Sequence, residues 1–234
     1  MRRALALAAK GRGAVEPNPM VGAILAKNNT LLSHAYHPRF GAPHAEAIAL
    51  ARAGAKAKGA TLYVTLEPCC HYGKTPPCTT AILDAKVARV VVAMIDPFSQ
   101  VHGKGIKLLR RNGIQVDVGL LEKSAKTLNA PFITRISEGR PFIIAKWAQS
   151  LDGRIALASG ESQWISSEES RALVQVMRGQ VDAIMVGIGT VLADDPLLMA
   201  RPPKGGRQIH RIATRIVLDS RCRLPLESKL GKSV

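Results

Sequence analysis

A histidine, a glutamate and two cysteines are spaced in this chain as a hydrolytic zinc site would require. His44 stands two positions before Glu46, and Cys69 and Cys78 follow with eight residues between them. One neutral imidazole and two thiolates are a ligand set of catalytic zinc, in which water takes the fourth position. Glu46 would then carry the proton that such a water must lose.

The same residue types also occur in proteins without a metal. Free cysteine is often buried and inert, so a structural role is the simpler interpretation of any one thiol alone. The set taken together favours a metal. A purely structural zinc would want a fourth protein ligand, and Cys70 and His71 are the candidates. Adjacent residues rarely ligate one ion together, so we interpret Cys70 as a bystander. Cys222 is too distant along the chain to assign.

The composition is that of a globular protein. Of 234 residues 47% are hydrophobic, and no run approaches the ~18 apolar residues of a membrane span. The first ten residues are basic, but their apolar stretch is too short for a signal peptide. Four cysteines, three of them within ten positions, indicate metal binding in a reducing compartment. We expect a cytoplasmic protein with no membrane partner; a plastid location stays open, and a homo-oligomer is compatible with the sequence.

A net charge of +16 needs an explanation. A solvated basic surface is the plainest one, and a phosphate-bearing small molecule is the next. The excess is greatest after residue 200, where nine Lys/Arg stand against Asp219 and Glu227. Aromatic residues are only 4% of the chain, which leaves few platforms on which single-stranded bases could stack. Nucleic acid is therefore a disfavoured partner.

Helices and strands alternate along the first half of the chain. The pattern predicts helices over 2–10, 45–53, 79–85 and 106–111, and strands over 21–27, 30–34, 61–66, 87–94 and 114–118. Pro43 and Gly54 bound the second helix, and Asn28-Asn29 turns the first two strands. Such alternation implies a layered α/β sheet with helices on its faces.

A second α/β segment follows the sequence Glu-Gly-Arg-Pro at residues 138–141, which we interpret as a linker. Strands are expected over 142–147, 182–186 and 215–218. A capping box, with Ser166 at the cap and Glu169 three residues later, predicts a helix that runs to Arg178. We therefore expect two domains, residues 1–140 and 141–234.

The expected elements can bring the ligands together. A His and a Glu two positions apart lie on opposite sides of a continuous helix, so they can flank one metal only at a helix end. Pro43 places His44 at such an end. Cys78 also precedes a helix, where the dipole favours a thiolate, and Cys69 follows a strand. All three ligands then come from the edges of elements that can meet at one end of the sheet.

His-x-Glu followed by Pro-Cys is typical of zinc nucleobase deaminases, although those separate their cysteines by two residues. The segments PNPMVG (17–22), HAE (44–46) and TLEPCCHYGKTPPC (65–78) resemble the deaminase half of the bifunctional riboflavin-biosynthesis deaminase/reductase family. The eight-residue spacing is specific to that branch. KWAQSLDGR (146–154), SQWI (162–165) and GTVLADDP (189–196) resemble the reductase half. The resemblance covers almost the whole chain, but the family usually has serine at Cys70 and a few more residues before the first helix.

The resemblance implies a cytidine-deaminase-like three-layer α/β/α domain followed by a partial dihydrofolate-reductase-like α/β domain. It implies zinc-dependent hydrolytic deamination of 2,5-diamino-6-ribosylamino-4(3H)-pyrimidinone 5′-phosphate, a phosphorylated pyrimidine. It also implies that NADPH then reduces 5-amino-6-(5-phosphoribosylamino)uracil. The family's reductase half is about twice as long as the segment after residue 140. That full-length half falls within the usual ~100–200 residues of a domain. We therefore expect deamination with weak or absent reduction by this chain alone.

The resemblance also assigns residues to both sites. For the deaminase it implies Glu46 as the catalytic residue, zinc ligands His44, Cys69 and Cys78, and substrate contacts at Asn18, His37, His71 and Lys74. For the reductase it implies NADP contacts at Ala148, Trp164, Thr190, Asp194 and Ser220, and substrate contacts at Ser162, Arg178, Leu198 and Arg201. The side-chain types suit these roles: an amide both donates and accepts, a lysine is a point charge for phosphate, and guanidinium groups suit a phosphate dianion.

Two other functions fit part of the pattern. A zinc deaminase acting on a nucleic-acid base, such as adenosine in transfer RNA, would suit the basic charge. The eight-residue cysteine spacing and the second α/β segment oppose it. A non-enzymatic zinc-stabilised module would require four protein ligands, and it would not depend on Glu46.

Overall fold

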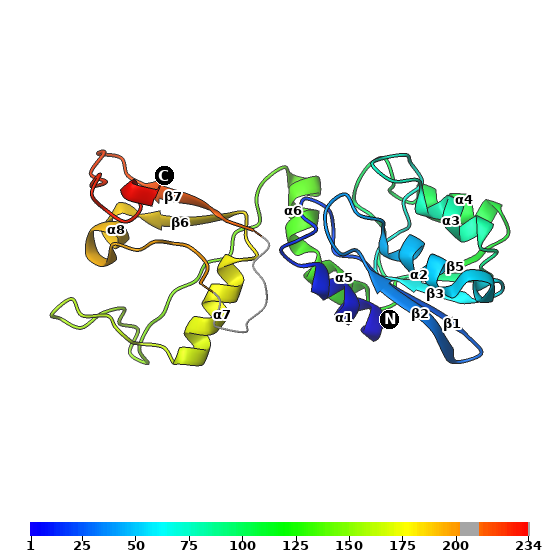
Figure 1. Ribbon diagram of the computed structural model, residues 1–234, viewed down its shortest axis with the longest axis horizontal. Helices are drawn as coiled ribbons and strands as arrows, with labels where there is room; N and C mark the ends of the chain where they lie inside the picture. Colours follow the sequence, from blue (N-terminus) through cyan, green and yellow to red (C-terminus); the bar gives the residue numbers. More distant parts are fainter. Residues whose placement is uncertain (202–210, 234) are drawn as a thin grey trace. The chain divides into compact units, whose positions relative to one another are not determined.

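The computed structural model describes residues 1–201 and 211–233. It divides into two compact units, Met1–Ile143 (unit 1) and Ile144–Val234 (unit 2) (Figure 1). Among the described residues, no helix combines the length and the apolar character that crossing a bilayer demands.

Unit 1 is built on a five-stranded sheet with the strand order β2-β1-β3-β4-β5. The strands are β1 (Gly22–Lys27), β2 (Thr30–Tyr36), β3 (Thr61–Val64), β4 (Arg89–Val92) and β5 (Gln115–Val118). β1 pairs antiparallel with β2 and β3, whereas β3, β4 and β5 are parallel. The carboxyl ends of the last three strands therefore open at one edge of the sheet.

The turn between β1 and β2 forms as its residue types predict. Asn28 and Asn29 both have positive φ angles, 49° and 60°. A two-residue hairpin turn of this kind needs left-handed backbone at both positions, which asparagine tolerates better than most residues. The predicted hairpin is confirmed, and β2 extends two residues beyond the expected 30–34.

Helices cover both faces of this sheet (Figure 1). They are α1 (Arg2–Ala8), α2 (Ala45–Ala53), α3 (Cys78–Asp84), α4 (Lys104–Arg111), α5 (Glu122–Leu128) and α6 (Ala130–Glu138), with short 3-10 turns at Ala9–Gly11 and Gly54–Ala57. α2, α3 and α4 lie on one face, and α1 and α5 lie on the other. α1 packs directly on β1, because a Cβ at Gly22 would overlap the carbonyl oxygen of Ala4. The result is a three-layer α/β/α arrangement.

The core of unit 1 lies between these layers. Leu25, Leu62, Val90 and Leu109 are all fully buried. Each side chain of this size stabilises the fold by about 1.5–3 kcal/mol when it leaves water. The strands and helix ends that carry the candidate site are therefore held by a packed core.

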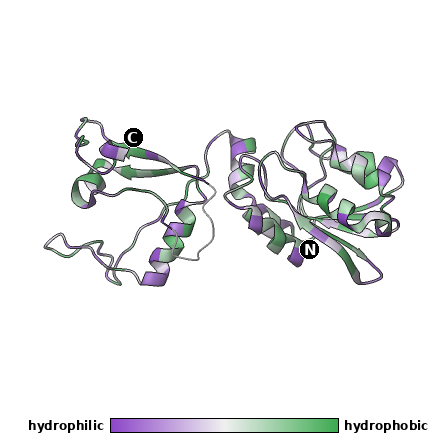
Figure 2. Ribbon diagram, viewed as in Figure 1, coloured by the Kyte–Doolittle hydropathy of each residue, from purple (hydrophilic) through white to green (hydrophobic). Residues whose placement is uncertain are grey.

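Unit 2 has a smaller core. It contains α7 (Glu168–Arg178), β6 (Ala183–Gly187), α8 (Ile188–Asp194), β7 (Thr214–Leu218) and a 3-10 turn at Gly231–Ser233. β6 and β7 are parallel, and Ile188, Val191, Leu198 and Leu230 form the buried cluster. Figure 2 shows β6 in hydrophobic colours, yet Met185 on it is 57% exposed. The sheet thus leaves apolar surface uncovered within the described residues.

Two expectations for the second half are wrong. Residues 142–147 form no strand, and Ile143 and Trp147 are 77% and 64% exposed. A strand needs a ladder partner and a covered face, and this segment has neither in the described structure. The cap of α7 is Ser167 rather than Ser166, since the Ser167 hydroxyl accepts the Ser170 N–H at 3.3 Å. The prediction chose the wrong one of two adjacent serines.

The sequence pattern also does not predict α5 and α6. α5 buries only Ala125 and α6 only Thr134, although α6 also packs the partly buried Ile133 against the core. Helices this short depend on their neighbours for stability. β4 is shorter than the predicted 87–94: Val87, Ala93 and Met94 are buried but lie outside the strand.

Candidate active site

The side chains of His44, Cys69 and Cys78 converge in unit 1. Their ligand atoms all lie within 4.8 Å of one another. His44 Nδ1 is 3.3 Å from Cys78 Sγ and 3.5 Å from Cys69 Sγ. Within residues 1–201 and 211–233, no further His, Cys, Asp or Glu belongs to this group. Three such donors fit a zinc ion whose fourth position remains for water. We call them the ligand group.

Helix starts position two members of the ligand group. His44 is the N-cap of α2, in extended backbone with φ −72° and ψ 160°, and Cys78 is the first residue of α3. Helix N-termini carry partial positive charge, which stabilises thiolates. The first turn of α3 also holds Cys69 directly: Cys78 N donates to Cys69 Sγ at 3.2 Å, and Thr79 N donates to the Cys69 carbonyl at 3.1 Å.

The two thiols share one proton in the absence of a metal. A hydrogen bond from the Cys78 thiol, supported by His44, lowers the pKa of Cys69 to about 4. The same hydrogen bond and burial raise the pKa of Cys78 well above its ordinary value. The hydrogen bond to Cys69 raises the pKa of His44. A cation that binds both sulfur atoms would displace the shared proton.

Glu46 is a buried acid beside the ligand group. It is the second residue of α2, only 3% exposed, and its Oε2 has no hydrogen-bond partner in the described structure. Burial raises the pKa of Glu46 to about 7, against the opposing effect of His44. A carboxyl group that exchanges its proton near neutral pH suits general acid–base catalysis.

His37 adjoins the ligand group, and Asn18 adjoins His37. The His37 ring meets the His44 ring edge-on, with centroids 5.3 Å apart. His37 Nδ1 lies 3.2 Å from the Pro43 carbonyl and Nε2 lies 3.5 Å from Asn18 Nδ2. Burial lowers the pKa of His37, so a neutral ring that donates from Nδ1 and accepts at Nε2 satisfies both contacts.

His71 and Lys74 lie in the loop that joins Cys69 to Cys78. The His71 ring packs edge-on against Phe98, with centroids 5.9 Å apart. The exposed Lys74 ammonium lies 4.0 Å above the ring of Phe40. Both residues therefore pack against aromatic side chains of neighbouring loops.

Cys70 points away from the ligand group. Its thiol faces the Gln100 carbonyl at 3.9 Å. Cys70 thus contacts the loop before α4 rather than the other two thiols. This placement agrees with its interpretation as a bystander.

In unit 2 the structure brings together Arg178, Leu198 and Arg201. Arg178 donates to the Met199 carbonyl at 3.4 Å, and Arg201 N donates to the side chain of Gln175 at 2.9 Å. Burial and then the charge of Arg201 lower the pKa of Arg178. Leu198 is 4% exposed and has a positive φ of 54°. Guanidinium groups suit a phosphate dianion.

Three of the residues that are expected to contact NADP lie at one end of the β6–β7 sheet. Thr190 and Asp194 belong to α8, which directly follows β6, and Ser220 follows β7. Because Gly187 and Leu218 are register partners at the carboxyl ends of parallel strands, these three lie beyond one edge of the sheet, where α/β proteins bind ligands.

The remaining predicted residues of unit 2 lie outside helices and strands. Ala148 and Ser162 are half-buried, and Trp164 is exposed. The Arg171 guanidinium lies 4.4 Å over the Trp164 ring.

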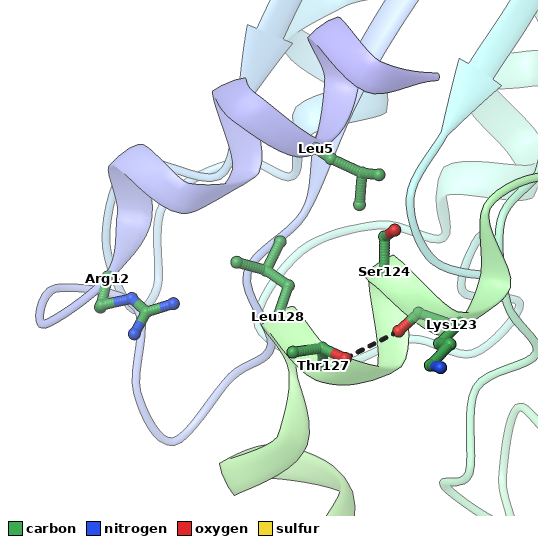
Figure 3. A pocket seen from close by; sticks show the side chains of 6 residues that line it. All are labelled: Leu5, Arg12, Lys123, Ser124, Thr127 and Leu128. Carbon is green, nitrogen blue, oxygen red and sulfur yellow. Dashed lines mark hydrogen bonds between the residues drawn. The ribbon is translucent and has the colours of Figure 1, made fainter.

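A separate pocket of about 470 Å³ lies in unit 1 beside α1 and α5 (Figure 3). It is lined by Leu5, Arg12, Lys123, Ser124, Thr127 and Leu128. The Thr127 hydroxyl already donates to the Lys123 carbonyl at 2.9 Å. None of the predicted site residues lines this pocket, so it does not coincide with the ligand group.

Glu67 is a second buried acid near the ligand group, and the sequence pattern assigns it no role. It is 3% exposed and stands two positions before Cys69. The sequence feature that could have revealed Glu67 is an acidic residue between the apolar Leu66 and Pro68, just after a buried strand. Asp96, 7% exposed, lies close by, and its backbone N–H donates to Glu67 Oε2.

Comparisons with known proteins place this geometry in a family. Residues 1–94 match the "Cytidine and deoxycytidylate deaminase zinc-binding region", and residues 141–233 match the "RibD C-terminal domain". The chain is 48% identical over 230 residues to "Riboflavin biosynthesis protein RibD" of Aquifex aeolicus, and 49% identical over 232 residues to that of Escherichia coli. The chain is thus similar to RibD proteins over nearly its whole length. It covers 64% and 63% of the lengths of these two relatives, while they match 98% and 96% of this chain.

Solved RibD structures have the same fold. The Thermotoga maritima structure titled "diaminohydroxyphosphoribosylaminopyrimidine deaminase/ 5-amino-6-(5-phosphoribosylamino)uracil reductase" matches with TM-score 0.90 at 42% identity, over all of this chain and 66% of that one. Acinetobacter baumannii RibD matches with TM-score 0.87 at 42% identity, over 99% of this chain and 65% of that one. The predicted fold class is confirmed, and neither alternative function is favoured.

Proposed function

We propose that unit 1 catalyses the zinc-dependent hydrolytic deamination of 2,5-diamino-6-ribosylamino-4(3H)-pyrimidinone 5′-phosphate, a step in riboflavin biosynthesis. The observation that carries this proposal is the buried Glu46, whose Oε2 lacks a partner, beside a group of three zinc-type ligands. A purely structural zinc site does not require a buried proton carrier. The similar Thermotoga maritima protein is a diaminohydroxyphosphoribosylaminopyrimidine deaminase, and this activity suggests the substrate.

The residues of unit 1 suit each part of this reaction. His44, Cys69 and Cys78 would hold zinc, which when bound supplies a water acidic enough to attack at neutral pH. Glu46 would take one proton from that water and pass it to a ring nitrogen, and would then carry the second proton, from the hydroxyl added at C2, to the departing amine. The oxygen of water thus replaces the C2 amino group, which leaves as ammonia.

Asn18, His37, His71 and Lys74 are proposed to orient the substrate. Asn18 and His37 place an amide and a neutral imidazole next to the ligand group, where they can meet the polar edge of a base or a ribose. Lys74 lies on an exposed loop between two ligands, and its ammonium suits the 5′-phosphate. A phosphorylated substrate also fits the net charge of +16.

Residues 1–140 are proposed as the deaminase domain and residues 141–234 as the first part of an NADPH-dependent reductase domain. In the latter, Ser162, Leu198 and the Arg178–Arg201 pair would bind the substrate phosphate and sugar. Ala148, Trp164, Thr190, Asp194 and Ser220 would bind NADP. The effect of the Arg201 charge on Arg178, and the position of α8 and Ser220 at one sheet edge, support this assignment.

We propose a cytoplasmic location. All four cysteines are free thiols, as expected in a reducing compartment.

Metal analysis combined with an ammonia-release assay tests the deaminase proposal. We expect about one zinc per chain, with ammonia released from the pyrimidinone phosphate but not from RNA. Glu46→Ala should keep the zinc and lose deamination. Release from RNA alone would favour a nucleic-acid deaminase, and full release by Glu46→Ala would overturn the proposal.

A further inference from the structure

The carboxylate of Glu67 binds three backbone N–H groups from one distant segment. Oε2 accepts from Gly103 at 2.8 Å and from Asp96 at 3.2 Å, and Oε1 accepts from Ile106 at 3.2 Å. Gly103 is the N-cap of α4, and its glycine provides no side chain to cap the helix. Glu67 therefore caps α4 from a site 36 residues away along the chain. Since Asp96 and Gly103 share one oxygen, the carboxylate also closes the loop 96–103.

The start of α4 lies directly against the peptide that precedes Cys69. A Cβ at Gly105 would overlap the carbonyl oxygen of Pro68 and would come within 3.3 Å of Glu67 Oε1. Only glycine allows this approach. Glu67 and Gly105 thus tie α4 to the segment that presents Cys69, while α3 holds Cys69 from its other side.

The loop that Glu67 closes also supports the two residues after Cys69. Its Gln100 carbonyl faces the Cys70 thiol at 3.9 Å, and its Phe98 ring packs against His71. One carboxylate therefore organises the backbone on both sides of a ligand.

We propose that Glu67 is a positioning residue, which holds Cys69 in the ligand geometry and shapes the loop behind His71. The inference rests on the proposed zinc function of the ligand group. Glu67 does not contact the reacting atoms, so its effect should appear first in how firmly zinc is held. Removing an outer partner of a metal ligand typically weakens metal binding by about 10- to 100-fold.

Zinc release into excess chromophoric chelator tests the proposal. Glu67→Gln keeps the shape of the side chain and one oxygen, but it sets an NH2 group against at least one backbone donor. We expect it to release zinc about 10-fold faster than wild type. Gly105→Ala leaves Glu67 intact and pushes α4 away from Pro68, and it should accelerate release as well. If Glu67→Gln fails to fold, Gly105→Ala carries the test.

Two control variants separate positioning from general loss of stability. Leu109→Ala opens a cavity in the core under the same helix, and it should lower Tm without changing zinc release. Gly189→Ala adds a methyl group where nothing lies within 4 Å, and it should change neither. If wild type holds no zinc and releases no ammonia, the proposed function fails. If wild type does both, but Glu67→Gln and Gly105→Ala release zinc no faster than Leu109→Ala, the positioning role of Glu67 is overturned.

Discussion

Replacing Glu46 with glutamine separates the charge of this side chain from its shape. Glutamine fills the same space but cannot carry a proton. A general acid–base group contributes about 10²- to 10⁴-fold to a rate, which corresponds to roughly 3–5 kcal/mol of transition-state stabilisation. Because Glu46 is not one of the three ligands, we expect the variant to keep its zinc and to release ammonia at least about 100-fold more slowly.

The same substitution should change how stability depends on pH in the metal-free protein. Burial raises the pKa of Glu46 from its ordinary 4.5 to about 7. The folded protein then holds this proton more tightly than the unfolded chain, so stability is lost as pH rises from 4.5 through 7. At about 1.4 kcal/mol per pKa unit, the loss is below ~1 kcal/mol at pH 5 and about 3 kcal/mol at pH 8.

Glu46→Gln has no such titration. Its free energy of unfolding, relative to wild type, should therefore rise by about 2–3 kcal/mol between pH 5 and pH 8. Any cost of burying the amide is the same at both pH values and cancels in this difference. Glu46 also raises the pKa values of His44 and Cys78, so the measured difference includes the response of these two groups to the loss of its charge.

Urea denaturation of chelator-treated protein at the two pH values measures this difference, and ammonia release with zinc present measures the activity. Glu122→Gln, which alters an exposed acid of α5, is the control. Its free energy of unfolding should stay within about 0.5 kcal/mol of wild type at both pH values. An unchanged rate of ammonia release would refute the proton-carrier role. An equal stability difference at pH 5 and pH 8 would refute the buried-carboxyl argument.

Three further outcomes are expected. Cys78→Ser should lose both zinc and deamination, whereas Cys70→Ser should keep both; metal analysis that finds zinc lost from the second variant would show that Cys70 is a ligand. Lys74→Ala should raise KM for the phosphorylated substrate about 10-fold, as the loss of a charged hydrogen bond predicts, and an unchanged KM would contradict phosphate binding there. The 234-residue polypeptide alone should oxidise NADPH with the deaminated substrate far more slowly than it releases ammonia, because the β6–β7 sheet leaves side chains such as Met185 exposed. Comparable rates would contradict this expectation.

Local signals were sufficient for several elements. Pro43, before the helix, and Gly54, after it, predict the bounds of α2, Ala45–Ala53, to the residue. The asparagine pair predicts the β1–β2 turn. These signals act within a few residues, so the chain alone expresses them. Residues 142–147 are largely apolar, as a buried strand would be, but they form no strand. A strand also needs a partner strand, which local sequence does not supply.

The sequence by itself determined which side chains could form the site: one imidazole, two thiolates and an acid two residues after the histidine. It also determined that His44 and Cys78 stand at helix starts, through the prolines before them. Only the tertiary structure decided that three ligand atoms from residues up to 34 positions apart lie within 4.8 Å. It also decided that burial raises the pKa of Glu46 and that Glu67 caps a helix begun 37 positions later. Burial and long-range hydrogen bonds arise only when distant segments pack together, and no local pattern encodes that packing.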